Sequence, residues 1–203
     1  MKNFETWIEK LGKREGVYSD SRHDWGGETF CGVARKRRPG WKGWPRVDQL
    51  KAGGRVRSFK TWAEVQAAEP ALFGLVIETA QSDYWEASGA ARFTDEPAWA
   101  EFQDAVADGA FNQGPGFAAD CIQHAVNALN KAGRLCPNLV VDGGIGPKTV
   151  AAVEAIFEAD GGAYYLTRAV RFFRERRYFA LAEKSEEQEL NLRSWLRRAG
   201  GQV

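Results

Sequence analysis

Residues 14–33 read REGVYSDSRHDWGGETFCGV, and the rest of the chain is organised around this stretch. Apolar residues precede it at the spacing of one helix face, namely Phe4, Trp7, Ile8 and Leu11. Glu15 is the next position on that face, and Gly16 directly after it is typical of a helix end. A carboxylate on an apolar face is costly unless it has a partner or a raised pKa. The pattern therefore marks Glu15 as a candidate acid, although an exposed acid at a helix end would also explain it.

A second carboxylate, Asp24, lies in the polar loop that follows the predicted helix. Gly26 and Gly27 allow a tight turn or a close approach of the backbone, and Thr29 adds a hydroxyl group. An acid on an apolar surface, an acid on a polar loop and a nearby hydroxyl are the groups that general acid/base hydrolysis uses. Taken alone, Asp24 is also explained as a turn-forming residue.

The order of these motifs resembles that of the glycoside hydrolase 108 muramidases. The matching motifs are Glu-Gly-x-Tyr from Glu15, Asp-x-Gly-Gly-x-Thr-x-x-Gly-Val from Asp24, and Pro-Gly-Trp-x-Gly-Trp from Pro39. The arrangement of Glu15, Asp24 and Thr29 is also similar to the Glu/Asp/Thr triad of T-even phage lysozymes, with one residue fewer before the threonine. Members of the family are lysozyme-like proteins that cleave peptidoglycan, and many are phage or prophage endolysins.

The resemblance continues into the C-terminal half, where the family carries a peptidoglycan-binding-type module. The matching residues are Asp108-Gly109-x-x-Asn112-x-Gly114, Gln123 and the segment 142–149. Read without the family, residues 142–147 predict a tight turn of the Asx type before a helix. The resemblance implies a mainly α, lysozyme-like helical fold with a small β-hairpin lobe, its two halves packed into one compact body. Residues 1–96 would form the catalytic region and residues 97–203 a helical peptidoglycan-binding-type region.

The function implied by the resemblance is hydrolysis of the β-1,4 bond between N-acetylmuramic acid and N-acetylglucosamine. Glu15 would be the general acid, Asp24 would position a water or stabilise the transition state, and Thr29 would hold that water. Glu28 and Asp20 are the alternatives to Asp24. The residues expected to contact substrate are Tyr18, Gly26, Gly27, Trp41, Trp44 and Asn112. The chain has eight tryptophans, which core packing and stacking on sugar rings explain about equally well.

Other functions remain open at this point. A non-catalytic cell-wall-binding protein would keep the fold without the reaction. A lytic transglycosylase would also need a glutamic acid, but it makes a 1,6-anhydro product without water. A nucleic-acid binder is suggested only by the basic run at residues 35–38, and no helix-turn-helix, RRM or zinc-knuckle pattern accompanies it. We therefore expect peptidoglycan glycan strands as the partner, and no nucleic acid.

The charges are distributed unevenly along the chain. The net charge is +1, but residues 1–60 carry +8, residues 61–164 carry −11 and residues 165–203 carry +4. A basic N-terminal third would steer the protein toward an anionic polymer. Peptidoglycan and nucleic acid both fit that description, and charges that neutralise each other across the fold are the alternative explanation.

The cysteines do not form a recognisable framework. Cys31, Cys121 and Cys136 are odd in number and lack the spacing of a zinc site, so we expect reduced, buried thiols. Cys31 lies near the candidate site, but His23 and His124 do not stand at the spacing of a Cys/His motif. We therefore expect neither a Cys–His hydrolase nor a metal or cofactor.

The periodicity predicts helices for most of the chain. They cover residues 2–15, start at Thr61, Pro70, Pro97, near Phe117 and at Pro147, and cover residues 163–182 and 186–199. Residues 16–60 are expected to be irregular, with a short hairpin that pairs residues 29–34 with residues 55–59. A solvated face is expected for the arginines of the first C-terminal helix, namely Arg171, Arg174, Arg176 and Arg177.

The N-terminus does not read as a signal peptide, because an amphipathic helix pattern follows Met1-Lys2 directly. No apolar stretch reaches the roughly 18 residues that a membrane-spanning helix needs. We therefore expect a protein made in the cytoplasm, without membrane insertion, that acts on the periplasmic cell wall after holin-type release or delivery. We also expect a monomer.

Overall fold

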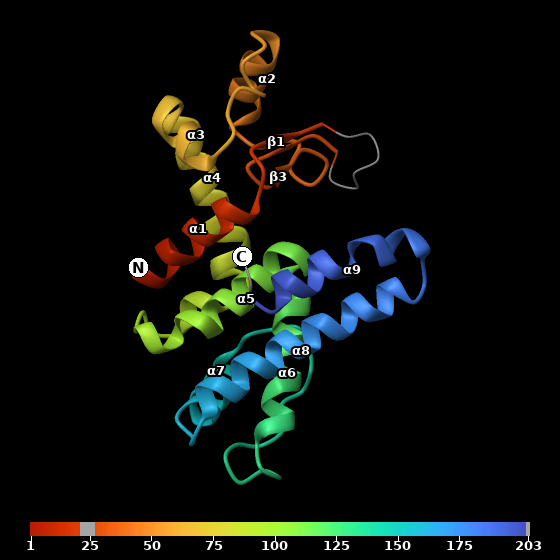
Figure 1. Ribbon diagram of the computed structural model, residues 1–203. Helices are drawn as coiled ribbons and strands as arrows, with labels where there is room; N and C mark the ends of the chain where they lie inside the picture. Colours follow the sequence, from red (N-terminus) through yellow and green to blue (C-terminus); the bar gives the residue numbers. More distant parts are fainter. Residues whose placement is uncertain (21–26, 202–203) are drawn as a thin grey trace. The chain divides into compact units, whose positions relative to one another are not determined.

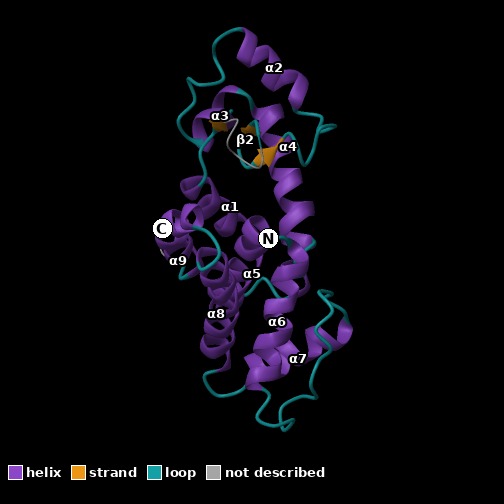
Figure 2. Ribbon diagram, turned by 90° about the vertical axis from the view of Figure 1, so that its right-hand side faces the viewer, coloured by secondary structure: helices purple, strands orange, loops and turns teal. Residues whose placement is uncertain are grey.

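The computed structural model describes residues 1–20 and 27–201, most of which are helical (Figure 1). The α-helices of this part of the chain are α1 (Lys2–Arg14), α2 (Trp44–Ala52), α3 (Trp62–Ala68), α4 (Pro70–Ala80), α5 (Ala100–Gln113), α6 (Pro115–Leu129), α7 (Pro147–Phe157), α8 (Gly162–Ala182) and α9 (Glu186–Ala199). Short π- and 3-10 helices are η1 (Gln81–Glu86), η2 (Ala90–Arg92) and η3 (Pro97–Trp99). An antiparallel sheet contains β1 (Tyr18–Ser19), β2 (Thr29–Phe30) and β3 (Val33–Ala34), drawn in orange in Figure 2. The predicted mainly α fold with a small β lobe is confirmed.

The chain packs into two units. The main unit consists of Met1–Trp7 and Ser82–Val203, and the inserted unit consists of Ile8–Gln81. Helix α1 therefore gives its first half to the main unit and its second half to the inserted unit. This division follows packing alone, and the predicted division of function between residues 1–96 and 97–203 stays a prediction.

Local signals in the sequence start the helices of the inserted unit. Thr61 caps α3, because its Oγ1 accepts a 3.2 Å hydrogen bond from the backbone amide of Glu64. The Glu64 carboxylate in turn accepts a 2.8 Å bond from the amide of Lys60. Trp62 then packs edge-on against Phe73 of α4, with ring centroids 6.1 Å apart. The predicted helix start at Thr61 is confirmed.

Two expectations for residues 16–60 are wrong. Residues 29–34 do contain strands, but β2 pairs with β1 and β3, whereas residues 55–59 form a turn. Both observed partners are closer in the sequence than the predicted one, and strands of two residues are too short for an alternating pattern to identify their pairing. The segment is also not irregular throughout, because α2 buries Trp44, Val47 and Leu50 at helical spacing. Gly43 precedes this helix, so the usual Ser, Thr, Asp or Asn start signal is missing.

Helix α5 forms the centre of the main unit. Its residues Phe102–Ala110 are all buried, which is the pattern of a helix packed on every face. Helices α6 and α8 pack against it, and α8 also packs along α9 (Figure 1). The N-terminal segment joins this core through aromatic rings, because Phe4 and Trp7 lie 5.5 and 5.7 Å from the ring of Trp85.

Arg174 of α8 is buried, which corrects the expected solvated face at this position. Its side chain is 1% exposed and its Nη2 lies 2.6 Å from Oδ2 of Asp108 in α5. Arg198 of α9 binds the other carboxylate oxygen at 2.9 Å. A Cβ at Gly109 would lie 3.2 Å from Cδ of Arg174, so the glycine makes room for the arginine. Three helices are therefore joined at one buried carboxylate.

Candidate functional site

Glu15 stands directly after the last residue of α1. Its backbone amide donates a 2.9 Å hydrogen bond to the carbonyl of Leu11, so the helical path continues through it. Leu11, one turn earlier, is 0% exposed and Val17, two residues later, is 4% exposed, whereas Glu15 itself is half-buried. Glu15 therefore lies between two buried apolar residues in the sequence, and its catalytic role stays a prediction.

Thr29 is held by the sheet of the inserted unit. Strand β2 pairs with β1 so that Thr29 stands opposite Ser19. Because side chains alternate along a strand, Thr29 shares its face with Ser19 and points away from the fully buried Phe30. Its Oγ1 donates a 3.2 Å hydrogen bond to the carbonyl of Gly27 and keeps lone pairs that can accept a hydrogen bond from water. The strand that follows Glu15 is thus paired with the strand of Thr29.

Asp24 and Gly26 lie outside the described residues. Gly27, where the description resumes, has φ of +63°, a left-handed conformation that favours glycine. A Cβ at this position would also lie 3.0 Å from Cε of Lys36. Gly27 therefore has a backbone conformation that favours glycine, while the tight turn and a contact of Gly27 with substrate stay predictions.

Glu28 is bound by three side chains that could not be identified from its neighbours in the sequence. It accepts a 2.7 Å hydrogen bond from the hydroxyl of Tyr18, and it forms ion pairs with Arg35 at 2.7 Å and Lys51 at 3.2 Å. The pKa of Tyr18 is raised, first by burial and then by its hydrogen bond to Glu28. These contacts join β1, β3 and α2, and they favour a role for Glu28 in positioning the hairpin.

Asp20 is bound by the same lysine. Lys51 Nζ lies 2.8 Å from Oδ2 of Asp20, and this hydrogen bond lowers the pKa of Asp20. A carboxyl with a lowered pKa is ionised at neutral pH and has no proton to donate. The role expected of Asp24 needs an ionised carboxylate, so Asp20 stays an alternative to Asp24, and its described contacts connect residue 20 to α2.

Trp41 and Trp44 are core residues of the inserted unit, with exposed fractions of 7% and 2%. Their rings pack edge to face with centroids 5.1 Å apart. The Nε1 of Trp41 donates a 3.0 Å bond to Thr79, and the Nε1 of Trp44 donates a 2.7 Å bond to the carbonyl of Arg38. Packing accounts for both side chains, and the expected sugar contact stays a prediction.

Asn112 belongs to α5 of the main unit. Its Nδ2 donates a 2.7 Å hydrogen bond to the carbonyl of Asp108, one turn earlier in the same helix. Asp108, from the same motif, is the buried partner of Arg174 and Arg198. A structural role explains Asp108, and the expected substrate contact of Asn112 stays a prediction.

The segment 142–147 is fixed by Gln123 of α6, which is 1% exposed. Its Oε1 accepts hydrogen bonds from the amides of Asp142 at 2.9 Å and Gly143 at 3.2 Å. Its Nε2 donates to Oδ1 of Asp142 at 2.7 Å and to the carbonyl of Gly144 at 2.8 Å. The amide of Gly144 also donates to Oδ1 of Asp142 at 3.0 Å, so the predicted Asx turn is confirmed.

The cysteines offer no activated nucleophile. All three are free and buried, as expected. Burial raises the pKa of Cys31 strongly and raises that of Cys121 to about 12. A thiol with a raised pKa is a poor nucleophile at neutral pH, which argues against Cys–His catalysis.

Two features are absent from residues 1–20 and 27–201. No group of three or more His, Cys, Asp or Glu side chains in this part is placed to hold a metal ion. None of its helices combines the length and the apolar character needed to cross a membrane.

Comparison with known proteins divides the chain into two matched regions. Residues 8–114 match the model of a family described as glycosyl hydrolase 108. Residues 118–200 match a model described as a predicted peptidoglycan domain. No curated protein shows a significant match to the chain.

Proposed function

Because the chain belongs to the glycosyl hydrolase 108 family, we propose that it is a lysozyme-type N-acetylmuramidase. It cleaves the β-1,4 bond between N-acetylmuramic acid and N-acetylglucosamine in peptidoglycan. The family match supports glycoside hydrolase activity, and the match of residues 118–200 to a predicted peptidoglycan domain supports the substrate.

The placement of Glu15 carries this proposal. The residue is half-buried at the end of α1, and the core residues Leu11 and Val17 flank it in sequence. A carboxyl group can act as a general acid on a glycosidic oxygen that comes within hydrogen-bond reach of it. Glu15 then protonates the leaving oxygen as the bond to the sugar breaks.

Asp24 and Thr29 take part in the proposal through water. Thr29 lies on the sheet face that points away from the core, and its hydroxyl oxygen can accept a hydrogen bond from a water molecule. Asp24 either activates that water or stabilises the positive charge on the sugar ring. We favour the inverting reaction, for which the carboxyl groups of Glu15 and Asp24 should lie roughly 6.5–9.5 Å apart.

The biological setting follows only from the family resemblance. Phage and prophage endolysins are the first choice, with release through a holin and action on the periplasmic wall. Tail-associated wall penetration and a host wall enzyme are the alternatives. Adding the purified protein to permeabilised cells and to isolated walls distinguishes its access to the wall from its activity on the wall.

Glu15→Gln is the test of the catalytic role. The change removes the acidic proton while keeping size and hydrogen bonding, so kcat on purified peptidoglycan should fall by about 10²–10⁴-fold. Clearing of a wall suspension measures the rate, and far-UV circular dichroism checks that the variant is folded. Glu9→Gln is the matched control, because Glu9 is an exposed acid of the same helix. Equal clearing by the Glu15 variant and the parent would refute the assignment.

Product analysis separates the remaining candidates. Hydrolysis releases a new reducing end at N-acetylmuramic acid, whereas a lytic transglycosylase releases a 1,6-anhydro product that is lighter by one water. Mass spectrometry of the soluble fragments distinguishes them. A parent protein that sediments with the walls but releases no fragment would be a binding protein instead.

A further inference from the structure

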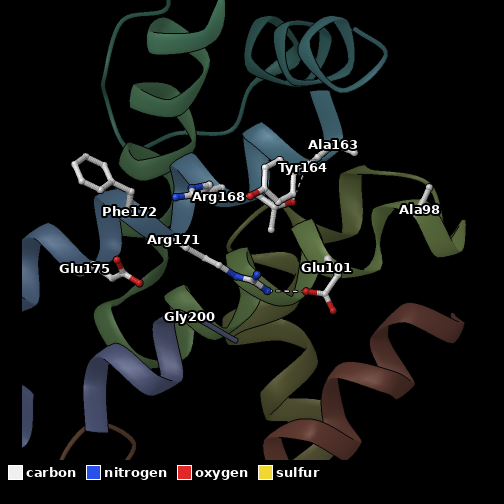
Figure 3. Close-up of a pocket in the computed structure, with 10 residues that line it drawn as sticks. Ala98, Glu101, Ala163, Tyr164, Arg168, Arg171, Phe172, Glu175 and Gly200 are labelled. Carbon is white, nitrogen blue, oxygen red and sulfur yellow. Dashed lines mark hydrogen bonds and ion pairs between the residues drawn. The ribbon is translucent and has the colours of Figure 1, made fainter. Parts of the chain in front are cut away.

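The main unit contains a cavity of about 590 Å³ beside α8. One wall is the face of α8 that runs from Ala163 to Glu175. Ala98 of η3 and Glu101, at the N-terminal end of α5, also line the cavity (Figure 3). This volume lies within the range of about 300–1,000 Å³ that is typical of small-molecule sites. All of its lining residues belong to the main unit, and none of them is a residue assigned to catalysis.

The cavity is bordered by large aromatic side chains that the fold leaves exposed. Tyr164 is 60% exposed and Phe172 is 54% exposed, and both line the cavity. They stand eight residues apart on α8, which places them close to the same face of the helix. Tyr165, next to the first of them, is 54% exposed as well. Exposed aromatic residues grouped around a hollow mark a binding surface, and their flat faces suit the apolar faces of sugar rings.

Arg168 stands midway between the two aromatic residues, one helical turn from each. Its Nη1 lies 2.8 Å from the hydroxyl oxygen of Tyr164, and Figure 3 shows these two side chains reaching toward each other. Within the part of the chain that the structure describes, Arg168 forms no salt bridge. The cavity's other arginine, Arg171, is paired with Glu101 at 2.7 Å. Arg168 therefore has donors left for a carboxylate from outside the protein.

We propose that this cavity binds a peptidoglycan fragment with a free stem-peptide carboxylate. The guanidinium of Arg168 binds that carboxylate, and Tyr164 and Phe172 contact the attached sugar. The α8 residues of the cavity lie within the region that matches a predicted peptidoglycan domain, which selects a wall fragment over other acidic glycans. The inference rests on the proposed substrate, and it adds a second place where that substrate is held.

Binding of a soluble muropeptide tests the proposal. The probe is a purified disaccharide-tetrapeptide, and Kd is measured by calorimetry with the full chain carrying Glu15→Gln, which prevents turnover. Adding Arg168→Gln should weaken binding by about tenfold or more, because a charge-assisted hydrogen bond is lost. Phe172→Ala should weaken it as well. The matched controls are Arg193→Gln and Phe179→Ala, an exposed arginine of α9 and an exposed phenylalanine of α8 outside the cavity.

A second probe identifies the group that Arg168 recognises. The same disaccharide-tetrapeptide with its carboxylates amidated should bind more weakly to the parent, and Arg168→Gln should no longer change its Kd. An unchanged Kd for the tetrapeptide probe in Arg168→Gln would overturn the proposal, as would a failure of the parent to bind it. Equal competition by duplex DNA would show a non-specific anion surface and would overturn it too.

The outcomes separate this site from the catalytic proposal. If the protein with Glu15 intact cleaves walls but fragment binding does not depend on Arg168, the cavity proposal is refuted and the catalytic proposal stands. If the protein with Glu15 intact binds the fragment through Arg168 but cleaves no wall, the catalytic proposal is refuted and the cavity proposal stands.

Discussion

Gln123 fixes the turn at residues 142–144 because both ends of its amide are used. Its oxygen accepts from two backbone amides, and its nitrogen donates to Asp142 and to the carbonyl of Gly144. A shorter or apolar side chain cannot reach or replace these partners. The residue therefore matches the family motif for a structural reason that is independent of wall binding.

Gln123→Leu should lower the free energy of unfolding by about 2–4 kcal/mol, because the amides of Asp142 and Gly143 lose their partner. Urea unfolding followed by circular dichroism measures the change. Asn191→Leu, an exposed amide of α9, should change the stability by less than about 0.5 kcal/mol. A small effect at Gln123 would mean that water replaces its amide without loss.

The pKa of the Asp142 carboxyl should depend on the same contact with Gln123. Its pKa is lowered, first by the hydrogen bond from Gln123 and then by the amide of Gly144. A group with a lowered pKa in the folded state stabilises the fold above its unfolded pKa of about 3.9, and this stabilisation is lost as the pH falls through the folded pKa. Gln123→Leu should therefore raise the pKa of Asp142 toward its ordinary value, as measured by NMR titration. An unchanged pKa would assign the shift to the turn alone.

Single residues differ in how well the sequence predicts them. The position of Glu15 at the end of an apolar helix face was predictable, because helical spacing is a local property. The partners of Glu28 were not, because Lys51 lies 23 residues away in the sequence, on a helix that was not predicted. Arg174 was predicted on a solvated face because its burial depends on Asp108, which is 66 residues away in the sequence.

Helices α5, α8 and α9 meet at the buried carboxylate of Asp108. Asp108→Ala leaves the guanidinium of Arg174, whose side chain is 1% exposed, without its carboxylate. The free energy of unfolding should fall by about 3–5 kcal/mol, the usual effect of leaving a buried charge without its partner. Arg198→Ala should have a smaller effect, because this side chain is 18% exposed and water can take its place. Urea unfolding of the two variants compares them, and equal losses would contradict this order.

Whole elements were predicted where their ends carry a local signal. The helix starts at Thr61, Pro70 and Pro147 are confirmed, because a capping box or a proline in the first turn acts within a few residues. The strand partner of residues 29–34 was predicted wrongly, because strands of only two residues carry no alternating pattern that indicates their pairing. Asp24 lies outside the described residues, so its part in the candidate site stays a prediction.

The two units should respond separately to local damage. Thr61→Ala removes the cap of α3, which should cost about 1 kcal/mol in the inserted unit. Amide hydrogen exchange should become faster in residues 8–81 and stay unchanged in residues 82–201. Thr61→Ser keeps the capping oxygen and should restore the slow exchange. Equal acceleration in both units would show that they unfold as a single cooperative body.

The split of α1 between the units sets the order in which the protein can be completed. Residues 1–7 leave the ribosome before the inserted unit, yet they pack with residues that follow position 81. They must wait while the whole inserted unit is synthesised. Closing this loop carries an entropic cost that rises slowly with length, by about 0.6 kcal/mol for each doubling. An inserted unit that has already folded replaces that flexible loop with a fixed connection. Synthesis from the N-terminus therefore favours a folding order in which the inserted unit folds first and residues 1–7 pack against the rest of the main unit last.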